Sequence, residues 1–202
     1  MRGNISRKTI LKLLTPFLIN IIHEVQWADR AATYYPPEKP ISLHGPATAI
    51  VRLALIEDRR LFITYLDEFW EEEDVGMINI INTARLGGKK VKYCIPQDPG
   101  QASKGQVKKY SLQMPGYNFE GIIESGSKED PAEAPGNWAK VNKFYIWDKA
   151  ATPELIKRFK KVCAEFPGHR HKDFVDALSG PKDLLFIWFM LQRMLVIMIK
   201  EE

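Results

Sequence analysis

The sequence predicts an α/β protein with one mixed β-sheet, in which three antiparallel strands are followed by parallel β-α units and flanked by helices. Three segments rich in β-branched and apolar residues come in succession near the start of the chain. Helical and strand patterns then alternate, which is typical of right-handed parallel crossovers. The 202 residues, 45% hydrophobic and 27% charged, suffice for one well-buried domain.

The first three predicted strands are Ile21 to Asp29, Thr48 to Ile56 and Leu61 to Phe69, the last two separated by a turn-like Glu57-Asp58-Arg59-Arg60. A helix is then predicted from Asp74 to Leu86. Acidic residues before it favour a helix start, and Gly87-Gly88 favours its end; the residues at helical spacing are Val75, Ile78, Ile81 and Arg85.

The rest of the domain continues the alternation. The predicted strands are Val91 to Pro96, Phe119 to Glu124 and Lys143 to Trp147, and a helix is expected from Gln101 to Gln113. Thr152 should cap a further helix that has Pro153 at its first position and Leu155, Ile156, Phe159 and Val162 on one side. A Gly/Ser/Pro-rich loop is predicted from Ser125 to Gly136.

Three regions follow from this pattern: a leader over 1–20, the α/β domain over 21–180 and an apolar C-terminal helix over 181–202. Leu184 to Ile199 is shorter than the roughly 20 apolar residues that a bilayer requires. We therefore expect that helix to pack on the core or on a partner and predict no membrane span. No signal peptide is predicted.

Charge and cysteine content narrow the function classes. The net charge is +4, and basic residues form clusters that suit either a polyanion or solvated helix faces. The two cysteines, Cys94 and Cys163, are too few for a disulfide framework and form no metal-binding CxxC. Nothing resembles a Ser-His-Asp or Cys-His arrangement.

Four aspartates are the candidate functional residues. Asp173 and Asp176 are three residues apart at the start of a helical pattern, so they share one helix face. Asp29 ends the first predicted strand and Asp98 ends the fourth. The order of elements matches the ribonuclease H-like arrangement, in which functional groups gather at the carboxyl ends of central strands. If the two strands are neighbours, the four acids can meet.

Such a group of carboxylates suits one kind of chemistry. Mg²⁺ and Mn²⁺ prefer oxygen ligands, and two such ions about 4 Å apart can activate a water and stabilise the leaving oxygen in phosphodiester hydrolysis. Taken singly, an aspartate at a strand end is more often a turn or cap residue. The joint placement is what favours a metal site.

Three blocks of sequence resemble the nuclease domain of the large terminase subunit of tailed bacteriophages and prophages. They occur in family order: Trp27-Ala-Asp-Arg-Ala-Ala-Thr33, Ile95-Pro-Gln-Asp-Pro-Gly-Gln-Ala-Ser-Lys-Gly-Gln106 and Phe166-Pro-Gly-His-Arg-His-Lys-Asp-Phe-Val-Asp-Ala-Leu-Ser179. The resemblance implies a Mg/Mn-dependent endonuclease that cuts concatemeric viral DNA during packaging. It implies two metal ions held by Asp29, Asp98 and one or both of Asp173 and Asp176.

The resemblance also implies partners and a location. Double-stranded DNA is the expected partner, alongside a separate terminase ATPase, the small terminase subunit or the portal, in the cytoplasm of a bacterial host. The expected DNA contacts are Lys104, Lys108, Lys128, Arg170 and Lys172. For the lysines after Asp98 a solvated helix face is an equal alternative, and for His169 and His171 a solvated basic loop is favoured over metal ligation.

Two departures from the family pattern stand out. Lys172 occupies the first of two positions that are usually both acidic, which removes one possible ligand. No phosphate-binding G-x-x-x-x-G-K-[ST] occurs, because Gln106 follows the glycine spacing of Gly100 to Gly105. The sequence is therefore interpreted as a nuclease module without the ATPase motor. The alternatives are a catalytically silent module that binds DNA or the packaging machinery, and a junction-resolvase-like nuclease.

Overall fold

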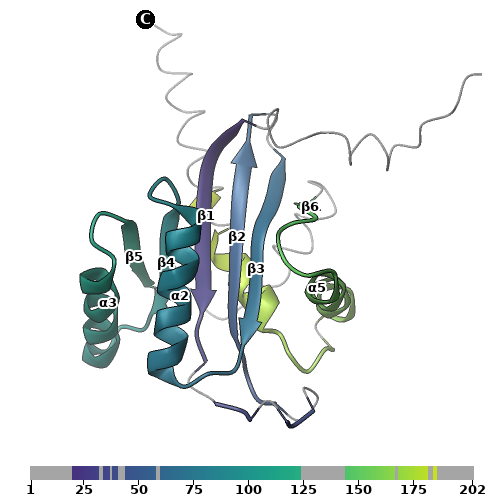
Figure 1. Cartoon of the computed structure of the whole chain (residues 1–202), viewed down its shortest axis with the longest axis horizontal. Helices are drawn as coiled ribbons and strands as arrows, with labels where there is room; N and C mark the ends of the chain where they lie inside the picture. Colours follow the sequence, from purple (N-terminus) through teal and green to yellow (C-terminus); the bar gives the residue numbers. More distant parts are fainter. Residues whose placement is uncertain are drawn as a thin grey trace, which may run out of the picture.

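Six strands form one mixed sheet in the order β5-β4-β1-β2-β3-β6 (Figure 1). The computed structural model describes residues 20–31, 34–36, 38–40, 44–57, 60–123, 144–166, 168–181 and 184–185. The first three strands, β1 (Ile21–Asp29), β2 (Thr48–Ile56) and β3 (Leu61–Phe69), form an antiparallel meander. The predicted mixed sheet is thus confirmed, with strand bounds that agree for the meander.

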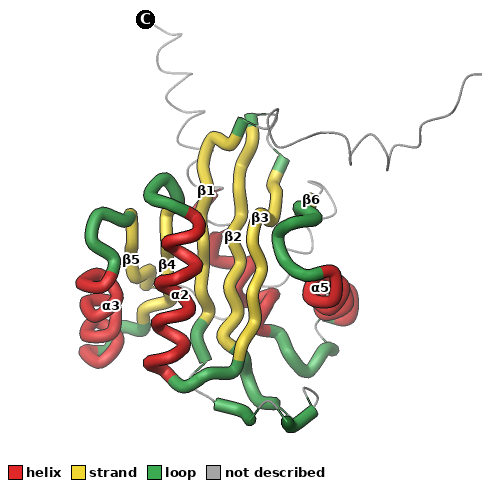
Figure 2. Tube along the Cα trace, viewed as in Figure 1, coloured by secondary structure: helices red, strands yellow, loops and turns green. Residues whose placement is uncertain are grey.

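Three parallel additions extend the meander on both sides. β4 (Lys92–Gln97) pairs with β1, β5 (Asn118–Ile123) pairs with β4, and β6 (Phe144–Ile146) pairs with β3. All nine residues of β2 are buried, which is what a central strand covered on both faces requires. Figure 2 shows α2 in front of the sheet and another helical segment behind it.

The helices α2 (Glu73–Gly87) and α3 (Gln101–Gln113) cover one face of the sheet. α2 begins with acidic residues and ends before Gly88, whose φ of 82° is the left-handed conformation that glycine adopts readily. Of the three apolar residues whose spacing predicted this helix, only Ile81 is buried. Val75 and Ile78 are 43% and 53% exposed, because α2 packs through Gly76, Ile80, Ile81 and Ala84.

The opposite face carries α5 (Pro153–Glu165) and a helix over 173–181. Thr152 caps α5 as expected, with its hydroxyl oxygen accepting from the Leu155 N–H at 3.2 Å. Phe159 of α5 and Phe174 of the second helix meet edge to face over the sheet. Both helices therefore share one apolar core with β1, β2 and β3.

The helix over 173–181 lies close to β1 because of a glycine. A Cβ added at Gly180 would stand 2.3 to 2.5 Å from ring atoms of Trp27, closer than real side chains approach. Gly180 therefore lets this helix pack directly on the strand that ends in Asp29.

Most of the predicted leader and most of the C-terminal apolar segment lie outside the described residues, as does the predicted loop from Ser125 to Gly136. The division into 1–20, 21–180 and 181–202 stays a prediction. Within the described part of the chain, no helix is long and apolar enough to cross a membrane.

Candidate functional site

Asp29 and Asp98 lie at the same edge of the sheet. β1 and β4 are hydrogen-bonded parallel neighbours, and Trp27 is in register with Cys94. That register puts Asp29 level with Pro96, two residues before Asp98. Because parallel strands end at the same edge, the sequence condition for bringing these two aspartates together is met. Asp29 is half-buried and Asp98 is exposed.

A third carboxylate, which sequence reasoning missed, lies in the same row. Asp29 pairs with Ala49 of β2, and Ala49 pairs with Glu68 of β3. Directly paired residues point to the same face of a sheet, so Glu68 and Asp29 flank Ala49 on one face. The sequence could have indicated Glu68, because the first and third strands of a meander run in the same direction. An acid near the end of β3 therefore lies at the same edge as Asp29.

Asp173, at the start of the helix over 173–181, reaches this edge from above the sheet. Its carboxyl accepts a hydrogen bond from the backbone of Ala47, just before β2 begins. Burial raises the pKa of Asp173, and the nearby Asp173 charge contributes to the raised pKa of Glu68, whose main cause is burial. Asp176, one turn later, is exposed. Asp173 is thus the member of the pair that lies against the sheet.

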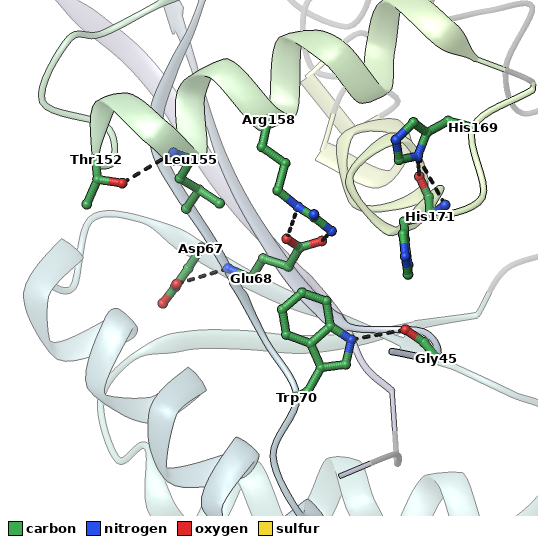
Figure 3. A network of polar contacts seen from close by, with 9 residues as sticks. All are labelled: Gly45, Asp67, Glu68, Trp70, Thr152, Leu155, Arg158, His169 and His171. Atoms are coloured by element: carbon green, nitrogen blue, oxygen red, sulfur yellow. Dashed lines mark hydrogen bonds and ion pairs between the residues drawn. The ribbon is translucent and has the colours of Figure 1, made fainter. Parts of the chain in front are cut away.

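Arg158 of α5 holds Glu68 in a network of polar and aromatic contacts (Figure 3). Its Nε lies 2.5 Å from one carboxylate oxygen of Glu68 and its Nη2 lies 3.2 Å from the other. The guanidinium also lies over the Trp70 ring, 5.6 Å from the centroid, and the Trp70 indole N–H donates to the Gly45 carbonyl at 3.0 Å. This network ties α5, β3 and the segment before β2 together beside Asp173.

The solvent exposure of the loop with His169 and His171 differs from the sequence prediction, which was a solvated basic loop. His171 is only 7% exposed, and in the part of the chain that the structure describes its Nε2 has no hydrogen-bond partner. The two residues bond to each other: the His171 backbone N–H donates to His169 Nδ1 at 3.1 Å. Burial of His171, which lowers its pKa, overturns the solvated interpretation for that residue.

The described carboxylates at this edge have the oxygen donors that divalent ions prefer, but they are not spaced to share one ion. Among the described residues, no group of three or more His, Cys, Asp and Glu side chains is arranged to hold a metal ion. Glu68 is engaged by Arg158, and Asp173 by backbone N–H groups. The oxygen-only donors at this edge match hard divalent ions, although joint coordination would require side chains to reorient.

Four of the five predicted DNA contacts are exposed residues, and the fifth lies outside the described residues. Lys104 and Lys108 are exposed on α3, which starts three residues after Asp98. The neighbouring Lys109 instead forms an ion pair with Asp74 at 2.8 Å. Arg170 and Lys172 are exposed just before Asp173, whereas Lys128 lies outside the described residues. Arg158, on α5, forms an ion pair with Glu68.

Comparison with known proteins identifies the fold. No protein-family model matches the chain, and no curated protein matches it in sequence. Solved structures do match, among them two from bacteriophage Sf6, each with a TM-score of 0.50 over 79% of this chain. One is a mutant of gp2c of the large terminase subunit with calcium, 10% identical and covered over 88% of its length. The other is the nuclease domain of the large terminase subunit gp2, 11% identical and covered over 87%.

At identities this low the match is informative about the backbone architecture alone. The chain therefore has the ribonuclease H-like fold of a terminase large-subunit nuclease domain.

Proposed function

We propose that this chain is a Mg/Mn-dependent DNA endonuclease module of a phage or prophage terminase, which cuts concatemeric viral DNA during packaging. The observation that carries the proposal is the convergence of Asp29, Asp98 and Asp173 on one edge of a terminase-nuclease fold. A fold by itself hosts many functions, so the acidic edge is the stronger argument.

The proposed metal ligands are Asp29, Asp98 and Asp173. Asp176, one turn further along the helix, is a proposed additional ligand. When bound, two divalent ions would activate a water and stabilise the leaving oxygen of the phosphodiester. The calcium in one of the Sf6 structures is in keeping with a divalent-ion site in this fold. Asp173 brings its half-buried carboxylate to the edge from the helix, and Asp29 brings its own from β1.

The proposed DNA path follows the exposed cations that flank this edge. Lys104 and Lys108 would contact backbone phosphates on the side of Asp98, and Arg170 and Lys172 on the side of Asp173. Lys128 remains a proposed contact from the sequence alone. Contacts of this kind give binding with little sequence preference and a strong dependence on salt.

The test is a plasmid-cleavage assay of the purified chain with Mn²⁺, combined with Mn²⁺ titration followed by electron paramagnetic resonance. Asp98→Asn should abolish linearisation and weaken Mn²⁺ binding at least tenfold, because it removes one anionic ligand and keeps the shape. Asp148→Asn is the matched control, since Asp148 is an exposed aspartate in the turn after β6. Cleavage retained in Asp98→Asn would refute the proposed site.

A second candidate is a catalytically silent module that binds DNA or the packaging machinery. The observation favouring it is that the described His, Cys, Asp and Glu residues form no ready three-ligand group. This module would retain salt-dependent DNA binding but leave the plasmid intact at every Mn²⁺ concentration. Cutting of four-way junctions in preference to linear duplex would instead indicate a resolvase-like enzyme.

In either form the proposed partners are double-stranded DNA and the other packaging proteins: a separate terminase ATPase, the small subunit or the portal. The proposed place of action is the cytoplasm of a bacterial host. Co-purification with an ATPase subunit from the same phage is the direct test of the protein partner.

A further inference from the structure

A second site lies on the face of the sheet that α2 and α3 cover. A pocket of about 190 Å³ opens where β1 ends, lined among others by Arg30, Thr48, Glu73, Met77, Gln106 and Tyr110. Arg30 directly follows Asp29, and Glu73 begins α2. The pocket therefore adjoins the acidic edge but belongs to other residues.

The guanidinium of Arg30 is held in place, but not all of its N–H groups have a hydrogen-bond acceptor among the described residues. Its Nη1 donates to the Gln106 side-chain oxygen at 3.0 Å, and its guanidinium lies 5.7 Å from the centroid of the Tyr110 ring. Its Nε is enclosed, and none of the residues that the structure describes accepts a hydrogen bond from it. An enclosed N–H without an acceptor costs on the order of 1–3 kcal/mol, and a small movement of the guanidinium toward an acceptor in the pocket would remove that cost.

Glu73 argues against a simple anion in this pocket. Its carboxylate accepts a hydrogen bond from Gln106 Nε2 at 3.0 Å, and it lines the same pocket as Arg30. A phosphate or carboxylate would gain from Arg30 and lose from Glu73. A neutral group that presents acceptors to the guanidinium and donors to the carboxylate satisfies both.

The size and lining fit one planar ring system. A cavity of about 150 Å³ holds one benzene ring, and this pocket is somewhat larger. Met77 supplies an apolar wall, while Tyr110 supplies an aromatic wall on which a ring can stack. Guanine carries adjacent acceptors at O6 and N7 and an amino donor, which is the pattern that an arginine and a glutamate recognise together.

We propose that this pocket binds an unpaired nucleobase of the DNA strand, with guanine as the best ligand. The proposal rests on the proposed function, because it takes DNA to be the molecule that crosses this edge. Asp29 and Arg30 follow one another at the end of β1 and point to opposite faces of the sheet, so a DNA strand that crosses this edge would pass both. The consequence is a preference for guanine beside the cut.

The test uses 2′-deoxyguanosine 5′-monophosphate on the whole chain in EDTA, followed by ¹⁵N NMR of the arginine Nε–H signals. We expect the Arg30 Nε–H and Tyr110 signals to shift with this nucleotide, and inorganic phosphate and deoxyribose 5-phosphate to leave them unchanged. Glu73→Gln should weaken binding at least tenfold while keeping the shape of the side chain. Glu72→Gln, the exposed residue before α2 that does not line the pocket, is the matched control.

Two variants keep the result decisive. Arg30→Lys retains the charge but lacks the Nε donor, and it should lose the preference for the guanine nucleotide over deoxyribose 5-phosphate. Equal shifts with inorganic phosphate, or unchanged binding in Glu73→Gln, would overturn the nucleobase assignment. The nucleotide titration is run in EDTA and the plasmid assay with Mn²⁺, so the two proposals can fail separately. Nucleotide binding without plasmid cleavage would support the pocket and reject the nuclease proposal. Plasmid cleavage without nucleotide binding would support the nuclease proposal and reject the pocket.

Discussion

The carboxylate of Glu68 on β3 and the guanidinium of Arg158 on α5 form a two-pronged ion pair across 90 residues of sequence. The side chain of Glu68 is 2% exposed and that of Arg158 is 23% exposed. Burial raises the pKa of Glu68 even though Arg158 acts to lower it. The guanidinium is therefore what makes an ionised carboxylate tolerable beside Asp173.

Arg158→Gln should destabilise the protein, because it leaves a buried carboxylate without its cation. Removal of one partner of a buried pair costs on the order of 3 kcal/mol, and the loss should appear as a lower urea midpoint. Adding Glu68→Gln to Arg158→Gln should recover part of it, since the uncompensated charge is then gone. An additive double mutant would contradict the coupling.

Stability should fall on mild acidification through His171. Burial lowers its pKa below the ordinary value of 6.5, so the folded state binds this proton more weakly than the unfolded chain. The His171 contribution is fully present above pH 6.5 and is lost as the pH falls through the lowered folded pKa.

The check is urea unfolding between pH 7.5 and 5 for the natural chain and His171→Asn. The variant should lose less stability over this range. Glu68 and Asp173 have raised pKa values and act in the opposite sense, losing their contribution as pH rises. The informative quantity is therefore the difference between the two proteins, and identical pH profiles would contradict the prediction.

Gly180→Ala should push the helix over 173–181 away from β1. The new methyl would overlap the Trp27 ring, and overpacking of this kind costs about 1–3 kcal/mol. The measurements are unfolding free energy and near-ultraviolet circular dichroism. Gly105→Ala is the control: it lies within α3 with open space around its Cβ, and it should stabilise by about 0.5–1 kcal/mol.

The salt dependence of DNA binding should identify the lysines that contact phosphate. Lys104→Ala and Lys108→Ala should each reduce the slope of log K against log salt by about 0.9. Lys109→Ala should change it less, because Lys109 is paired with Asp74. Fluorescence polarisation of a labelled duplex in EDTA measures the three slopes, and equal effects at all three positions would indicate a diffuse charge effect.

Lys172→Asp should strengthen Mn²⁺ binding by adding a carboxylate next to Asp173. The backbone should accept this change, because the Lys172 carbonyl already receives the N–H groups of Val175 and Asp176 at the helix start, where aspartate is a favoured cap. Lys160→Asp makes the same charge change on the exposed side of α5. Calorimetry should show tighter Mn²⁺ binding in the first variant only.

The sequence by itself determined the elements and their order. The meander strands, the Thr152 cap and the end of α2 at Gly87 followed from apolar patterns, turn residues and capping chemistry, which act over a few residues. It also indicated Asp29 and Asp98 as strand-end acids. These features are local, so neighbouring residues suffice to specify them.

The tertiary structure decided which of these features meet. The pairing of β1 with β4 brings Asp29 and Asp98 to one edge, and the row through Ala49 adds Glu68. Packing also pairs Arg158 with Glu68 and buries His171. The buried face of α2 and the pocket at Arg30 also arise only when helices pack on the sheet. Such contacts join residues far apart in the chain, and their energies depend on exclusion of water by the whole fold, which no local pattern records.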